Sequence, residues 1–74
     1  MKINDTFHVD NCTILAFQDE SLKEDFSCSE VLIDGEKYKV ANAQAVSSIS
    51  GNLVGFIRLE KTPEITVGEF EIVK

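Results

Sequence analysis

The sequence predicts an all-β fold, a small antiparallel barrel or sandwich of five or six strands, and three observations support this prediction. Residues 31–40 have the pattern of a β-hairpin around an Asp-Gly turn. Apolar and polar residues alternate in several other stretches, and turn-forming residues recur about every ten residues. A chain of 74 residues suffices for one domain, so we treat residues 1–74 as a single small β-barrel domain.

The first strand region covers residues 6–17, where Phe7 and Val9 alternate with polar residues. The alternation changes phase at Asp10-Asn11, which predicts a bulge or a short turn there. The run from Ile14 to Phe17 is apolar at every position, which favours a strand covered on both faces. We expect most of the aromatic side chains to lie in the core, as so small a domain needs their buried area. These side chains are Phe7, Phe17, Phe26, Tyr38, Phe56 and Phe70.

Residues 18–30 are polar and acidic, with five carboxylates against the one lysine, Lys23. This segment therefore contributes most of the net charge of −6. Leu22 and Phe26 are four residues apart, the spacing at which side chains meet on one side of a helical turn. We expect a loop or a single turn that Leu22 or Phe26 anchors.

The hairpin at residues 31–40 has a physical cause. Asp34 and Gly35 tolerate the positive φ angles that a two-residue hairpin turn requires. The apolar residues on either side of the turn share one parity, which places them on one face of the sheet. They are Val31, Ile33, Tyr38 and Val40, whereas Lys37 and Lys39 are expected to face water.

Residues 41–50 allow two interpretations. As a strand, the stretch needs a bulge just after Val40 to account for a change of phase. As a helix, Ala41, Ala45 and Ile49 would stack on one face, and Gly51 would supply the C-terminal cap. We favour the strand with a bulge, while a short helix near 41–50 would change the class to α+β.

Two more strand regions complete the pattern. Residues 53–60 are a strong strand in which Gly55 indicates a bulge or a close backbone approach. Pro63 ends this strand because it cannot donate to a ladder. The last region, residues 65–73, alternates on either side of Gly68, which is expected to redirect the chain.

Three segments together resemble a known family. They are Val31-Leu32-Ile33-Asp34-Gly35, Asn52-Leu53-Val54-Gly55-Phe56-Ile57-Arg58-Leu59 and Ile65-Thr66-Val67-Gly68-Glu69. The pattern resembles the β-barrel second domain of translational GTPases of the elongation factor Tu type, over roughly residues 31–72. The chain lacks the family's GTPase domain, and the acidic residues 18–30 replace a glycine-flanked segment of the family. In the family this barrel is a docking surface for RNA or partner domains. The resemblance implies an architecture for this chain, and no GTP chemistry.

The residues give no sign of catalysis or of a bound metal or cofactor. His8 is the only histidine, and no nucleophile with an orienting group can be assigned to it, so we expect an exposed surface residue and no enzyme. The carboxylates at 19, 20, 24 and 25 lack the glycine that calcium loops use at their sharp turn. Cys12 and Cys28 form no metal-type pair, and we expect buried thiols in a reducing compartment. A disulfide between neighbouring strands is the other interpretation.

Charge and hydropathy limit the partners. A net charge of −6 is opposite to the basic footprint of nucleic-acid binders and is repelled by anionic membrane surfaces. No apolar run is long enough to span a bilayer and the N-terminal residues do not form a signal peptide, so we expect a cytoplasmic protein. A partner recognised by charge should have a basic surface, though the charge can also serve only to keep the protein soluble and monomeric.

We therefore expect a non-enzymatic, acidic module that binds another protein. The partner-binding residues predicted from the sequence are Asp19, Glu20, Glu24, Asp25 and Glu30. The alternative is an inhibitor, of the kind that phages and mobile elements encode, that mimics nucleic acid and blocks a nucleic-acid-binding enzyme. A small enzyme or ligand carrier is a third possibility, which a deep pocket containing His8 or a perturbed carboxylate would support. An unpaired edge strand could also produce a homodimer.

Overall fold

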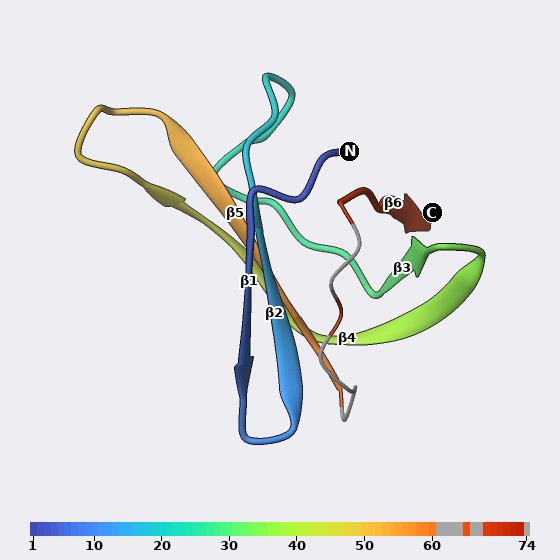
Figure 1. The fold of residues 1–74 in the computed structure, drawn as a ribbon. Coiled ribbons are helices and arrows are strands. Elements are labelled where there is room, and N and C mark those ends of the chain that lie inside the picture. Colours follow the sequence, from blue (N-terminus) through green and yellow to red (C-terminus); the bar gives the residue numbers. More distant parts are fainter. Residues whose placement is uncertain (61–64, 66–67, 74) are drawn as a thin grey trace.

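The computed structural model describes residues 1–60, 65 and 68–73, and it confirms the all-β class. In this part of the chain, six strands form one antiparallel sheet in the order β1-β2-β5-β4-β3-β6 (Figure 1). The described residues contain no helix. The strands are β1 (Asp5–Val9), β2 (Cys12–Phe17), β3 (Glu30–Ile33), β4 (Glu36–Ser47), β5 (Leu53–Leu59) and β6 (Glu71–Val73). The sheet curves strongly but does not close into a barrel.

The structure has a two-residue turn at each of the two positions where the sequence indicates one. Asp34 and Gly35 have φ angles of 52° and 82°, and they join β3 to β4 with Ile33 opposite Glu36. Asp10 and Asn11 have φ angles of 52° and 64°, so the phase change in residues 6–17 is a two-residue turn between β1 and β2. In both cases positive φ matches the twist of the two flanking strands.

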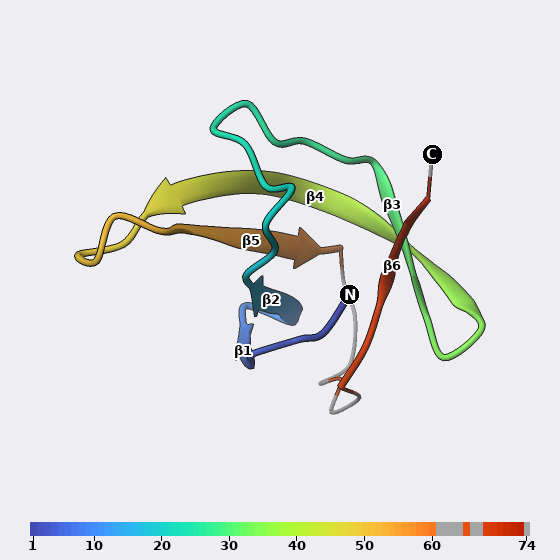
Figure 2. The same cartoon turned by 90° about the horizontal axis from the view of Figure 1, so that it is seen from above.

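Residues 41–47 continue β4, so the helical interpretation of residues 41–50 is wrong. The register shifts between Val40 and Asn42, which is the bulge that the strand interpretation requires. A bulge bends a strand and increases its twist. Residues 36–39 of β4 pair with β3 and the stretch from Val40 to Ser47 pairs with β5, so this bent strand connects the two parts of the sheet (Figure 2).

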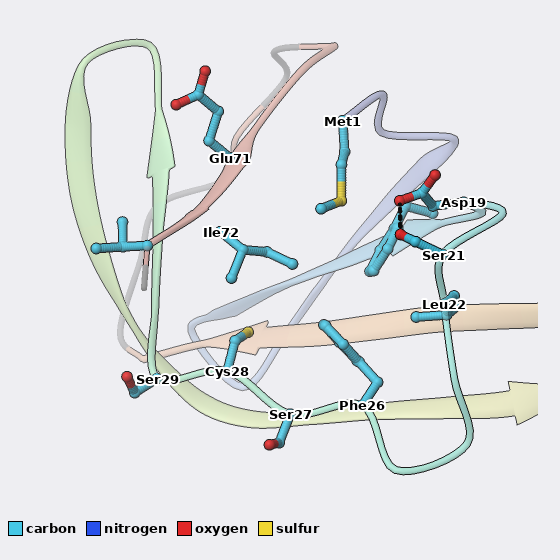
Figure 3. A pocket seen from close by; sticks show the side chains of 12 residues that line it. Met1, Asp19, Ser21, Leu22, Phe26, Ser27, Cys28, Ser29, Glu71 and Ile72 are labelled. Atoms are coloured by element: carbon cyan, nitrogen blue, oxygen red, sulfur yellow. Dashed lines mark hydrogen bonds between the residues drawn. The ribbon is translucent and has the colours of Figure 1, made fainter.

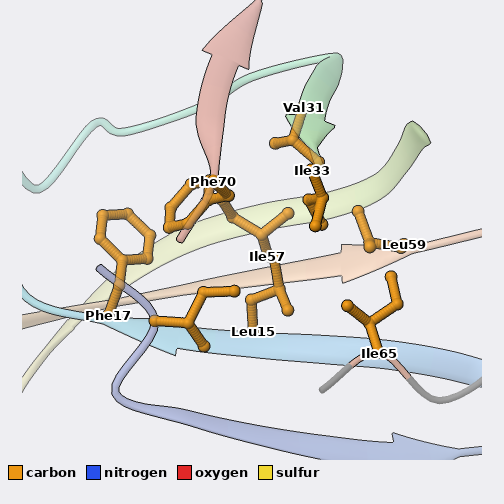
Figure 4. Packing of buried hydrophobic residues seen from close by; sticks show 9 residues of the cluster. Leu15, Phe17, Val31, Ile33, Ile57, Leu59, Ile65 and Phe70 are labelled. Carbon is orange, nitrogen blue, oxygen red and sulfur yellow. The ribbon is translucent and has the colours of Figure 1, made fainter. Parts of the chain in front are cut away.

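The core lies inside the curve of the sheet, where side chains from β2, β3 and β5 meet (Figure 4). Phe17 is 1% exposed and lies in edge-to-face contact with the rings of Phe70 and Phe26, at centroid distances of 5.0 and 5.5 Å. The buried apolar cluster consists of Ile3, Leu15, Phe17, Val31, Ile33, Ile57, Leu59, Ile65 and Phe70.

The expectation that Phe7 lies in the core is wrong. Phe7 and Val9 are 46% and 47% exposed. Phe7 is paired with Ile14, and residues directly opposite each other in a sheet share a face. That face is the convex one, because the neighbouring residues of β2, Thr13 and Leu15, are buried on the concave side. Phe56 is only half-buried, also on the convex face.

The N-terminal residues lie beside the segment that precedes β6. The Ile3 N–H donates to the carbonyl oxygen of Gly68 at 2.7 Å, and the Phe70 N–H donates to that of Met1 at 2.8 Å. In the described part of the chain, an isolated bridge between Lys2 and Glu69 joins the residues before β1 to the residues before β6. Within the predicted strand region 65–73, the structure assigns Glu71–Val73 to a strand; the break at Pro63 lies outside the described residues.

The two outermost strands of the described sheet are β1 and β6. The Thr6 N–H donates to Oδ1 of Asp5 at 2.8 Å, so one backbone donor of β1 already has a side-chain acceptor. Such an acceptor reduces what an edge offers to another strand. A homodimer through an edge strand stays a prediction.

Candidate binding site

The acidic segment forms a loop of two successive turns between β2 and β3. The Leu22 N–H donates to the carbonyl oxygen of Asp19, and the Phe26 N–H donates to that of Lys23, both at 3.0 Å. Leu22 and Phe26 are half-buried and pack against the core. The predicted anchors are therefore both used, and together they fix the loop at two points.

A hollow of about 540 Å³ lies between this loop and β6 (Figure 3). Phe17, Leu22, Phe26, Cys28 and Ile72 supply its apolar lining. The other residues that line it are Met1, Asp19, Ser21, Ser27, Ser29, Glu71 and Val73. Its volume is in the range of pockets that bind ligand-sized groups, roughly 300–1,000 Å³.

Two carboxylates border the hollow from different elements. Asp19 belongs to the loop, where its Oδ2 accepts a hydrogen bond of 2.6 Å from the hydroxyl of Ser21. Glu71 belongs to β6 and is exposed (Figure 3). Glu71 is not among the residues predicted from the sequence, because only the pairing of β6 with β3 brings it next to the loop.

The structure keeps four of the five predicted partner-binding residues together. Asp19, Glu20, Glu24 and Asp25 are all exposed on the loop. Glu30 is half-buried in β3, where its cross-strand neighbour is Lys39. Cross-strand pairs of opposite charge attract each other, so Glu30 is in a different environment from the other four carboxylates.

The loop carboxylates make no ion pair with any described residue. Among the described residues, the single ion pair joins Arg58 to Asp10, at 3.9 Å between Nη2 and Oδ2. This pair lies beside the β1–β2 turn on the opposite part of the sheet from the loop. The negative charge of the loop is therefore available to a partner.

Cys28 lines the hollow, and its surroundings change the pKa of its thiol. Burial raises the pKa of its thiol above the ordinary value of a cysteine, because desolvation disfavours the thiolate. Cys12 and Cys28, both within the described residues, are not joined by a disulfide. His8 is exposed on β1 and does not line the hollow.

The convex face of the sheet has a second apolar surface. Phe7, Val9 and Val46 are large exposed side chains there, and Ile14 and Phe56 border a shallow hollow of about 290 Å³. Nothing in the structure shows what covers this face.

No group of three or more His, Cys, Asp or Glu side chains among the described residues is arranged to hold a metal ion. The part of the chain that the structure describes has no helix that is long and apolar enough to cross a membrane.

No known protein family, curated protein or solved structure matches this chain. The resemblance to the second domain of translational GTPases therefore stays a prediction.

Proposed function

We propose that this chain is a non-enzymatic, cytoplasmic module that binds a basic surface of another protein through its acidic loop. One observation carries the proposal: Asp19, Glu20, Glu24 and Asp25 are exposed on a loop that Leu22 and Phe26 fix to the core. A fixed loop loses little conformational entropy on binding, so its charges are presented at low cost.

Complementary charge mainly increases the rate of association and selects among partners. The net charge of −6 makes acidic proteins and nucleic acids poor partners. Glu30 is outside the proposed surface, since Lys39 is its neighbour across the strands.

The test is affinity capture from a lysate of the host cell with the wild-type chain and two variants. Glu24→Lys with Asp25→Lys reverses the charge of the loop. Asp5→Lys with Glu36→Lys makes the same change in net charge at exposed positions on β1 and β4 and is the control. We expect basic proteins to be retained by the wild type and the control and lost with the loop variant. Equal retention by all three chains contradicts the proposal.

Competition with duplex DNA distinguishes the nucleic-acid mimic from a general protein binder. A mimic occupies the same groove as DNA, so DNA displaces it and its affinity falls steeply with added salt. A partner that also contacts the apolar hollow keeps a salt-insensitive part of its binding energy. The presence of the hollow beside the carboxylates favours the protein-binding module over the mimic.

A further inference from the structure

The apolar hollow and the acidic loop form one continuous surface. Asp19 belongs to both, and Leu22 and Phe26, which anchor the loop, also line the hollow. A basic segment bound to the loop carboxylates therefore lies directly over an apolar opening. An apolar opening beside a charged rim is the usual arrangement of a binding site with a central anchor side chain.

We propose that the hollow accepts a single apolar side chain from the partner, in a segment where lysine or arginine flanks that side chain. This inference rests on the proposed function and specifies its partner. The lining of Phe17, Phe26 and Ile72 supplies an apolar surface, and the cavity of about 540 Å³ has room for a leucine or a phenylalanine side chain.

Charge selects the flanking residues. Asp19 borders the hollow from the loop and Glu71 borders it from β6, so a basic residue on either side of the anchor meets a carboxylate (Figure 3). Two positive groups lie nearby: Lys23 in the loop, and the amino group of Met1, which donates to the carbonyl oxygen of Phe70 at 2.6 Å. The carboxylates at 20, 24 and 25 outnumber them on the exposed side of the loop.

An anionic small molecule is disfavoured here, because the rim has the two carboxylates of Asp19 and Glu71 against the single amino group of Met1. A neutral apolar small molecule would fill the hollow without using the carboxylates. The charge on the rim is therefore the observation that favours a basic peptide segment as the occupant.

The test uses two synthetic peptides on the intact chain, followed by amide chemical shifts in ¹H–¹⁵N NMR spectra. One peptide has a central leucine between lysines, and the other has glycine in place of that leucine. We expect the leucine peptide to shift the amides of Leu22, Phe26, Cys28 and Ile72 and to bind several-fold more tightly than the glycine peptide. Equal affinity, with shifts confined to the acidic positions, overturns the hollow as anchor site and leaves the proposed function standing. No shift with either peptide overturns the proposed function as well.

A filled hollow gives the second measurement. Cys28 lines the hollow and its side chain points into it (Figure 3), so Cys28→Trp places a ring there. Ser47→Trp is the control, which adds the same ring at an exposed position at the end of β4, outside the lining. We expect Cys28→Trp to weaken the binding of the leucine peptide by roughly tenfold and to leave the binding of the glycine peptide unchanged. A loss of the same size in the control, or no loss in Cys28→Trp, contradicts the inference.

Discussion

The ring of Phe17 lies directly against the backbone of Gly55. The two residues are paired across β2 and β5, and a Cβ atom on Gly55 would overlap with Cε1 and Cζ of the ring and come within 3.0 Å of its Cδ1. The glycine that the sequence marks for a bulge or a close approach is therefore used for a close approach. It provides the space in which Phe17 contacts both Phe26 and Phe70.

We expect Gly55→Ala to lower the free energy of unfolding by about 1–3 kcal/mol, because overfilling a packed core forces side chains and backbone to shift. Gly68→Ala is the control, since an added Cβ there has nothing within 4 Å. Urea denaturation followed by circular dichroism measures both. Combining Gly55→Ala with Phe17→Leu should recover part of the loss, and equal stability of the two alanine variants would show that the ring moves aside freely.

The β3–β4 turn supplies a second prediction. Gly35 has a φ of 82°, a conformation that costs a residue with a Cβ roughly 1–2 kcal/mol. We expect Gly35→Ala to destabilise the protein by about this amount, and Gly35→Asn by less, because asparagine tolerates positive φ. The comparison of the two variants by thermal denaturation isolates the backbone effect, as no heavy atom lies within 4 Å of a Cβ at this position. Similar losses in both variants would contradict it.

The exposure of Phe7 and Val9 supplies a third prediction. We expect Phe7→Ser with Val9→Thr to cost less than about 1 kcal/mol, as surface substitutions usually do. Leu15→Ala removes a fully buried side chain from the neighbouring strand and should cost roughly 2–5 kcal/mol. Both changes are measured by the midpoints of denaturant unfolding, compared at an equal slope of unfolding free energy against denaturant concentration. A large loss in the double variant would mean that the convex face is covered, for instance by a second copy of the chain.

Local features of the sequence were sufficient to predict the strands and turns. The turns at Asp34-Gly35 and Asp10-Asn11 depend on the φ preferences of two residues, and the bulge after Val40 appears as a local change of parity. Which face of a strand is buried is not local: parity gives Phe7 and Val9 one face, but only the pairing with β2 shows that this face is outside.

The candidate site also has one part that the sequence predicts and one part that only the pairing of the strands reveals. The acidic loop and its anchors Leu22 and Phe26 follow from composition and spacing within one segment. The hollow requires β6 to lie near the loop, and that placement comes from the pairing of β6 with β3. Glu71 could therefore not be recognised from the sequence.

Tyr38 supplies a prediction on pH. Its hydroxyl donates to Oε2 of Glu36 at 2.9 Å, and this hydrogen bond raises the pKa of the phenol above its ordinary value, with smaller contributions from burial and from the charges of Glu36 and Asp34. We expect Glu36→Ala to lower the pKa of Tyr38 toward that ordinary value. Tyr38 is the only tyrosine and the chain has no tryptophan, so ultraviolet absorbance of the phenolate reports on it alone.

The sign of the linked stability change follows from the same shift. A raised folded-state pKa stabilises the fold fully below the unfolded-state pKa, and this contribution is lost as the pH rises through the folded-state pKa. Alkaline denaturation of Glu36→Ala should therefore show a smaller dependence of stability on pH in this window than the wild type. Asp34→Asn removes only a minor contribution and should move the pKa of Tyr38 less.

Cys28 supplies the last prediction, on thiol reactivity. Burial raises the pKa of its thiol, so at a given pH a smaller fraction is thiolate, the form that reacts with iodoacetamide. We expect Cys28 to be alkylated more slowly in the folded chain than in the chain unfolded in urea. The pH at which the alkylation rate reaches half its maximum should also be higher in the folded chain. Mass spectrometry of proteolytic fragments separates Cys28 from Cys12. Because Cys28 lines the hollow, the leucine peptide should slow its alkylation further and the glycine peptide should not. Equal rates in folded and unfolded chains would show that the thiol is solvated.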